Sequence, residues 1–167
     1  NEILSISLPV NNQILQEVLK PGAARNALEC ALWDLEAKKE GKPVWQLLNL
    51  KEPKPTITAY TISLSNPAKM MQDAKSKSDY PILKIKLGGQ DDEKCIKAVR
   101  EGSPNSRIIV DANEGWNIER FNYLVPIFKS IGVELIEQPF PSNKDHLLKN
   151  LDRKIPICAD ESCHDVK

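Results

Sequence analysis

From residue 55 onward, short apolar runs alternate with stretches in which apolar residues recur every three or four positions. The apolar runs lie at residues 56–64, 82–87, 107–111, 133–137 and 155–159. The stretches between them, at about 67–78, 91–101, 117–131 and 145–151, have the periodicity of amphipathic helices. Pro126 predicts a kink or an interruption in the third of these helices. Strands that alternate with helices at this spacing predict βαβ units and a parallel sheet.

The first third of the chain has a helical pattern instead. Ala24, Ala27, Leu28, Ala31, Leu32 and Leu35 recur at three- and four-residue steps. They predict an amphipathic helix that begins at Ala23 and ends at Gly41, after a less distinct short helix near 13–19. Pro53 and Pro55 mark a break in the chain, so we place a domain boundary between residues 1–54 and 55–167.

Composition excludes several classes of partner. The 167 residues carry 23 basic and 23 acidic side chains, and this balance argues against a nucleic-acid or membrane-surface partner. No apolar run is long enough to span a bilayer and no secretory signal is evident, so we expect a cytoplasmic protein. The four cysteines form no metal-binding pair and are expected to be reduced thiols. The sequence does not settle the oligomeric state, and a homo-oligomer is possible.

Two lysines interrupt the apolar run at Ile82–Gly88. Lys84 and Lys86 are two positions apart, so both project from the same face of the predicted strand. One interpretation is an edge strand that uses lysine to prevent aggregation. The other is a site that supplies negative charge, because ammonium groups are costly to bury without a partner.

Ionisable residues also follow the next three predicted strands. Asp111 and Asn113 follow the third strand, Glu137 ends the fourth, and Asp160 and Glu161 follow the fifth. Right-handed crossovers place the carboxyl ends of all these strands at one edge of the sheet, and in a barrel they converge on one mouth. A doubly wound open sheet is the alternative fold, but it brings successive strand ends together less naturally.

Three carboxylates at such a mouth are typical of a hard divalent cation. Asp111, Glu137 and Asp160 supply only oxygen ligands, which suit Mg²⁺ or Mn²⁺ better than zinc. Each of these acidic residues taken alone is more simply a turn or helix-cap residue, but three in phase beside a lysine pair predict a metal site. Trp116 covers the site or packs in the core, and the sequence does not decide between these two.

At these residues the chain resembles the enolase superfamily, in particular the muconate-lactonising subgroup and its dipeptide epimerases. The matching segments are K-I-K-L-G at 84–88, V-D-A-N-E-G-W at 110–116, I-E-Q-P at 136–139 and A-D-E-S at 159–162. The helix at 24–35 is similar to the segment that leads from the family's capping domain into its barrel. The resemblance therefore implies an α/β fold: about the first five strands of a TIM-like (β/α)7β barrel, truncated before the sixth strand, preceded by the C-terminal helical part of an α+β capping domain.

The resemblance also implies roles for individual residues. Asp111, Glu137 and Asp160 would bind Mg²⁺, with Mn²⁺ as a possible substitute. Lys86 would be the acid/base on one face of the substrate, and Lys84 would support it and bind the substrate carboxylate. Asn113 and Glu161 would contact the ligands rather than the metal, and Thr61 would contact the substrate. A lysine with a depressed pKa could then remove the α-proton next to a carboxylate, through an enediolate.

The implied activity is the Mg²⁺-dependent epimerisation of dipeptides, with a small-molecule substrate. The family's second acid/base is a lysine on the sixth strand, and an Asp-x-Asp on the eighth reads the amino end of the dipeptide. Both lie outside these 167 residues, so we expect the chain to be part of a longer protein. The preferred dipeptide is not predicted. Alternatives within the subgroup are a cycloisomerase, an o-succinylbenzoate synthase or an N-acylamino acid racemase; outside it, the alternative is a non-catalytic partial-barrel remnant.

Overall fold

The computed structural model describes residues 10–165, which divide into two compact units. The first holds three helices, up to Thr56, and the second runs from Ile57 to Cys163. We describe each unit by itself. None of the helices in the described residues is long and apolar enough to cross a membrane.

The first unit consists of α1 (Asn12–Val18), α2 (Ala23–Glu40) and α3 (Val44–Leu47). Helix α2 ends as predicted, because Gly41 adopts the left-handed conformation (φ 64°) and its N–H bonds to the carbonyl of Ala37. No residue of α2 is buried. Leu35, for example, is 47% exposed.

The second unit is a five-stranded parallel sheet with helices between its strands. The strands are β1 (Tyr60–Ile62), β2 (Ile82–Lys86), β3 (Arg107–Asp111), β4 (Val133–Glu137) and β5 (Ile157–Cys158), and they pair in that order. A doubly wound sheet reverses its strand order, whereas consecutive strands of a barrel are neighbours throughout. The sequential order therefore agrees with the first strands of a (β/α) barrel.

The connecting helices are α4 (Pro67–Ser76), α5 (Asp92–Gly102) and α6 (Ile118–Ser130), with the 3₁₀ helix η2 (Ser142–Asn150) before β5. Asn66 and Asn117 cap α4 and α6 by accepting backbone N–H bonds from the residues three positions on. Pro126 lies inside α6, which continues through it, so the interruption allowed by the sequence does not occur. The short helix predicted at 145–151 is present as part of the 3₁₀ helix η2.

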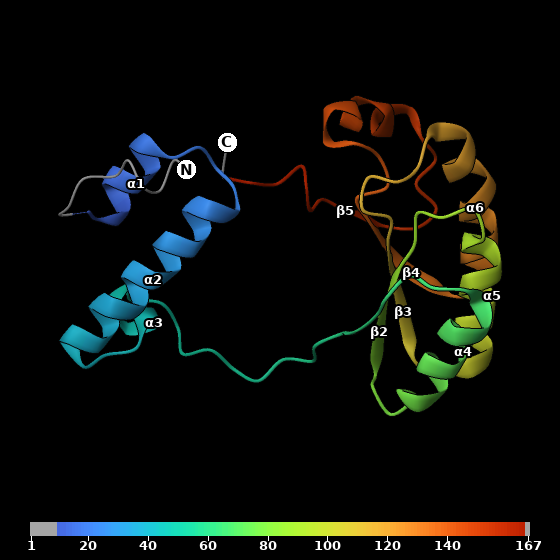
Figure 1. Cartoon of the computed structure of the whole chain (residues 1–167), viewed down its shortest axis with the longest axis horizontal. Coiled ribbons are helices and arrows are strands. Elements are labelled where there is room, and N and C mark those ends of the chain that lie inside the picture. The colour runs from blue at the N-terminus through green and yellow to red at the C-terminus, as the bar shows by residue number, and fades with distance from the viewer. Residues whose placement is uncertain (1–9, 166–167) are drawn as a thin grey trace. The chain divides into compact units, whose positions relative to one another are not determined.

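Helices α4, α5 and α6 lie along one face of the sheet (Figure 1). The core lies between them and the sheet, where side chains such as Ile85, Ile96, Val110 and Phe128 are fully buried. Along β2 the burial alternates, so that Leu83 and Ile85 face this core while Lys84 and Lys86 lie on the opposite face. Strand β2 pairs with β1 on one side and β3 on the other, which excludes the edge-strand interpretation of the two lysines.

Two predicted strands are shorter than their apolar runs. Only Tyr60–Ile62 of the run at 56–64 forms β1, and only Ile157–Cys158 of the run at 155–159 forms β5. The ladder between β1 and β2 includes only these three residues of β1. Hydrophobic runs therefore located the strands, and pairing with the neighbouring strand set their ends.

Candidate active site at the carboxyl ends of the strands

The two lysines of β2 make ion pairs with carboxylates from the next two strands. Lys86 Nζ donates to Asp111 Oδ2 at 2.6 Å, and Lys84 Nζ donates to Glu137 Oε1 at 2.7 Å. Lys84 Nζ also lies 3.0 Å from Asp111 Oδ2. The strand register explains these pairs, because Lys86 is paired with Asp111 and Asp111 with Glu137. All three side chains therefore project from the same face of adjacent strands.

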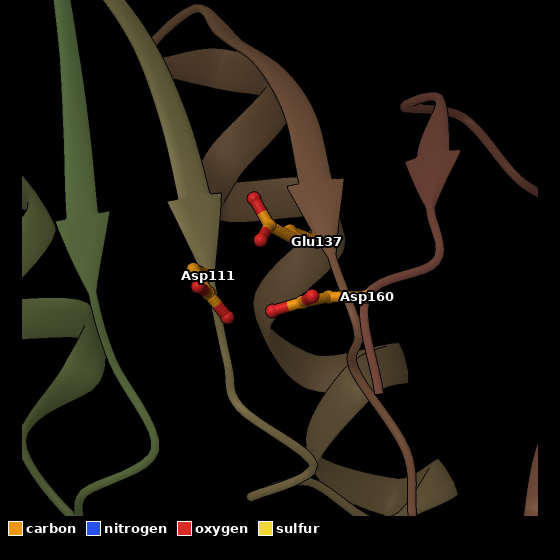
Figure 2. A group of neighbouring side chains, drawn as sticks. All are labelled: Asp111, Glu137 and Asp160. Atoms are coloured by element: carbon orange, nitrogen blue, oxygen red, sulfur yellow. The ribbon is translucent and has the colours of Figure 1, made fainter. Parts of the chain in front are cut away.

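The three predicted metal ligands come together at the ends of β3, β4 and β5 (Figure 2). One carboxylate oxygen from each of Asp111, Glu137 and Asp160 lies within 4.8 Å of the other two. The Asp111 side chain is completely buried, Glu137 is partly buried and Asp160 is exposed. The group of carboxylates is thus accessible to solvent at Asp160 and buried at Asp111.

The site's own charges hold Lys84 and Asp111 ionised. Burial disfavours the charged form of Lys84, but hydrogen bonds to Glu137 and Asp111 outweigh it and raise the pKa of this ammonium. Burial likewise opposes ionisation of Asp111, but hydrogen bonds from Lys86, Lys84 and the Asn113 N–H lower the pKa of its carboxyl. A raised pKa favours Lys84 as a fixed positive charge rather than as a proton acceptor.

The remaining predicted residues lie around this group. Asn113 accepts a bond from Lys86 Nζ at 2.8 Å and donates to Glu161 Oε1 at 3.1 Å, so it links the lysine to the chain after β5. The other oxygen of Glu161 is buried and has no hydrogen-bond partner in the described part of the chain. Thr61 is exposed on β1 and is paired with Lys84, which places its side chain on the same face of the sheet.

The donor set fits a divalent cation. Three carboxylates face two ammonium groups, so the cluster carries excess negative charge that a divalent ion would neutralise. Every candidate ligand is a carboxylate oxygen, the donor that Mg²⁺ and Mn²⁺ prefer. Asp111, Glu137 and Asp160 are accordingly the residues that could hold such an ion.

The sequence interpretation missed the part that Gln138 plays. This buried side chain follows Glu137, and its Oε1 accepts bonds from the backbone N–H groups of Asp160 (2.9 Å) and Ser162 (3.1 Å). Its Nε2 donates to Ser162 Oγ at 2.8 Å. Gln138 thereby attaches the segment that carries Asp160 to the end of β4. Its place inside the I-E-Q-P segment was the available signal.

Of the two roles that the sequence allows for Trp116, the structure shows packing in the core. It is only 2% exposed, and its ring lies 5.7 Å from that of Phe128 in an edge-on arrangement. Its indole N–H donates to the Asp92 carboxylate at 2.8 Å. Trp116 therefore supports the loop after β3 from behind rather than covering the site.

Two family models match the chain. The model described as "Enolase C-terminal domain-like" matches residues 67–167, and "Mandelate racemase / muconate lactonizing enzyme, N-terminal domain" matches residues 9–49. Among curated proteins, an N-acetyl-D-glutamate racemase from a Pseudoalteromonas species is 42% identical over 90% of this chain. An L-Ala-D/L-Glu epimerase from Escherichia coli is 39% identical, also over 90% of this chain. The chain spans 47% of each relative, or about half of its length.

Solved structures give the same result. An enolase family member from Agrobacterium tumefaciens, described as homologous to dipeptide epimerases and bound to sodium and L-Ala-L-Glu, superposes with a TM-score of 0.83. It is 48% identical, and the match covers 92% of this chain and 47% of that one. A dipeptide epimerase from Cytophaga hutchinsonii, complexed with Mg and D-Ala-L-Val, has a TM-score of 0.80 and 30% identity over 91% of this chain and 44% of its own.

Proposed function

The chain belongs to the enolase superfamily, and from this premise we propose that the full-length protein epimerises dipeptides by removing a proton next to a carboxylate. The observation that carries the proposal is the side-chain nitrogen of Lys86, which lies 2.6 Å from a carboxylate oxygen of a group suited to a divalent cation. A base beside a cation is the arrangement needed to remove a weakly acidic α-proton.

The residues divide the chemistry as follows. Lys86 Nζ, as the free amine, takes the α-proton of the substrate, and the electron pair of the broken C–H bond moves into the carboxylate to give an enediolate. Lys84, held charged by Glu137 and Asp111, offers positive charge to the substrate carboxylate. Return of a proton to the opposite face of the α-carbon, from a second acid/base, inverts its configuration.

Asp111, Glu137 and Asp160 would hold the cation, with Asn113 bonded to Asp111 and Lys86, and Glu161 bonded to Asn113. Bound there, Mg²⁺ or Mn²⁺ would supply positive charge where the enediolate becomes negative. Thr61, on the same face as Lys84, is within the proposed substrate surface. We also propose that the boundary near residue 55 separates the capping-domain segment from the barrel segment.

The test is isotope exchange. Full-length protein with Mg²⁺ and L-Ala-L-Glu in D₂O is expected to lose the α-proton signal of the glutamate residue by NMR and to accumulate the L-Ala-D-Glu epimer. Absence of exchange across a panel of dipeptides would refute the dipeptide proposal.

A second candidate is racemisation of N-acyl amino acids, favoured by the 42% identity to the N-acetyl-D-glutamate racemase. Both reactions remove the same kind of proton and differ in the group attached to the amino nitrogen. The same assay with N-acetyl-D-glutamate decides between them. Exchange on this substrate without exchange on any dipeptide would replace the first candidate by the second.

A further inference from the structure

Helix α5 begins with a buried carboxylate that the proposed chemistry does not use. The side chain of Asp92 is completely buried, on the helix that follows Lys86. A carboxylate is buried at a high free-energy cost unless hydrogen bonds or an opposite charge compensate it. Its partners therefore indicate what the buried charge does.

One oxygen of Asp92 holds the loop that leaves β2. Oδ1 accepts the backbone N–H of Gly88 at 3.0 Å and that of Gly89 at 2.9 Å. Gly88 is two residues beyond Lys86, and it adopts a positive φ of 122°. Asp92 thus fixes the backbone immediately after the proposed base.

The other oxygen holds the loop that leaves β3. Oδ2 accepts the indole N–H of Trp116 at 2.8 Å and lies 3.1 Å from Arg120 Nη2. Arg120 in turn donates to the carbonyl of Gly89. Trp116 follows Asp111 and Asn113 in the chain. Asp92 is therefore bonded both to the segment after Lys86 and to the segment after Asp111.

The two loops touch each other, which makes this connection rigid. A Cβ at Gly115 would lie 2.8 Å from the Ala112 carbonyl oxygen and 3.0 Å from Gly88 Cα. No side chain fits at that approach, and a shift of one loop must therefore move the other. Asp92 bonds to both sides of this contact.

We propose that Asp92 is a positioning residue that keeps the ammonium of Lys86 in place beside Asp111 and Asn113. This inference rests on the proposed function. Loss of the buried charge would loosen the exits of β2 and β3 together, and small displacements of a reacting group are costly to the chemical step. Substrate affinity would change little, because Asp92 lies behind the site and does not face the substrate.

The test compares two neighbouring aspartates. Asp92→Asn keeps the size of the side chain but places an amide donor against N–H donors. Asp91→Asn removes the same charge at the same helix start, from an exposed side chain that pairs with Lys94. We expect Asp92→Asn to lower kcat for α-proton exchange about 10- to 100-fold. We expect KM to stay within about threefold, with Asp91→Asn close to wild type.

A purely structural role would lower the urea midpoint and leave kcat of the folded protein unchanged, and that result in Asp92→Asn would overturn the proposal. If Asp92→Asn does not fold, Trp116→Phe removes one hydrogen bond and preserves the aromatic packing. A reduced kcat at unchanged KM in Trp116→Phe supports the proposal, and a wild-type kcat overturns it.

A metal titration separates this inference from the proposed function. If the wild type exchanges no substrate, the proposed function fails, and Mn²⁺ binding by electron paramagnetic resonance becomes the readout in the same variants. Asp92→Asn should weaken Mn²⁺ binding about 10-fold. If Asp92→Asn does not fold, Trp116→Phe should weaken Mn²⁺ binding in its place. Affinities equal to that of Asp91→Asn would overturn the positioning role.

Discussion

Helix α5 carries Asp92 at its start and Arg100 near its end, and the charges of these two side chains are compensated in different ways. Arg100, near the amino ends of the strands, donates to backbone carbonyls, including those of Ser106 (2.7 Å), Ile131 (2.9 Å) and Gly132 (3.3 Å). These carbonyls belong to the loops that enter β3 and β4. Asp92, near the carboxyl ends, holds the loops that leave β2 and β3.

The surroundings of Arg100 and Asp92 also differ. Around Arg100, the backbone satisfies the guanidinium, and burial lowers the pKa of Arg100. At the carboxyl ends of the strands, the two lysines of β2 lie close to the three carboxylates. Asn113, Glu114 and Gln138 there adopt positive φ angles of 43°, 63° and 34°. Strained backbone and concentrated charge cost stability and are typical of functional sites, whereas a guanidinium satisfied by carbonyls contributes to folding. The two ends should therefore respond to mutation in different assays.

The largest expected effect is on activity at the carboxyl end. Lys86→Met should lower α-proton exchange by about 10²- to 10⁴-fold, because it removes the proposed base. NMR in D₂O measures the rate, and Lys97→Met, which removes an exposed lysine of α5, is the matched control. Full exchange from both epimers in Lys86→Met would remove Lys86 from the mechanism.

A smaller loss is expected when a group that positions a ligand is removed. Gln138→Ala deletes the acceptor of the Asp160 and Ser162 N–H bonds and should weaken Mn²⁺ binding about 10- to 100-fold. Titration followed by electron paramagnetic resonance measures the affinity, with the exposed Gln90→Ala as control. Unchanged affinity would mean that Asp160 is held in place without Gln138.

At the amino ends of the strands, a mutation is expected to change stability rather than activity. Arg100→Met should lower the free energy of unfolding by about 2–3 kcal/mol, because carbonyls of two loops lose a charged donor. Urea denaturation measures this loss, and kcat and Mn²⁺ affinity should stay at wild-type values. Arg153→Met, at an exposed position, is the control. A lower kcat with unchanged stability would erase the contrast between the two ends.

The smallest effect concerns a buried hydroxyl pair at the same end. Ser106 Oγ lies 2.7 Å from Ser103 Oγ and donates to the Tyr80 carbonyl at 2.8 Å. Ser106→Ala should cost about 1 kcal/mol of unfolding free energy and leave exchange unchanged. Denaturation beside Ser130→Ala, which removes a hydroxyl bonded within its own helix, measures the difference. Equal midpoints would show that the buried pair contributes nothing.

The sequence predicted what depends on spacing along the chain. Apolar runs and helical periods gave the order of the elements, and one carboxylate per βα unit led to Asp111, Glu137 and Asp160. The structure brings these three together and pairs Lys86 with Asp111 in register.

The sequence did not predict what depends on contacts between loops. The connections made by Asp92 and Gln138 depend on which backbone N–H groups meet each side chain, and spacing alone does not encode this. Trp116 was ambiguous for the same reason, since only its bond to Asp92 shows which way the indole points.

We propose that the carboxyl ends of β3, β4 and β5 form a divalent-metal site beside the lysine pair. A Mn²⁺ titration of the full-length protein, followed by electron paramagnetic resonance of the free ion, tests this site in wild type, Asp111→Asn and Arg100→Met. We expect one bound Mn²⁺ per chain in wild type and Arg100→Met, and loss of that ion in Asp111→Asn. Equal binding by wild type and Asp111→Asn would contradict the proposal.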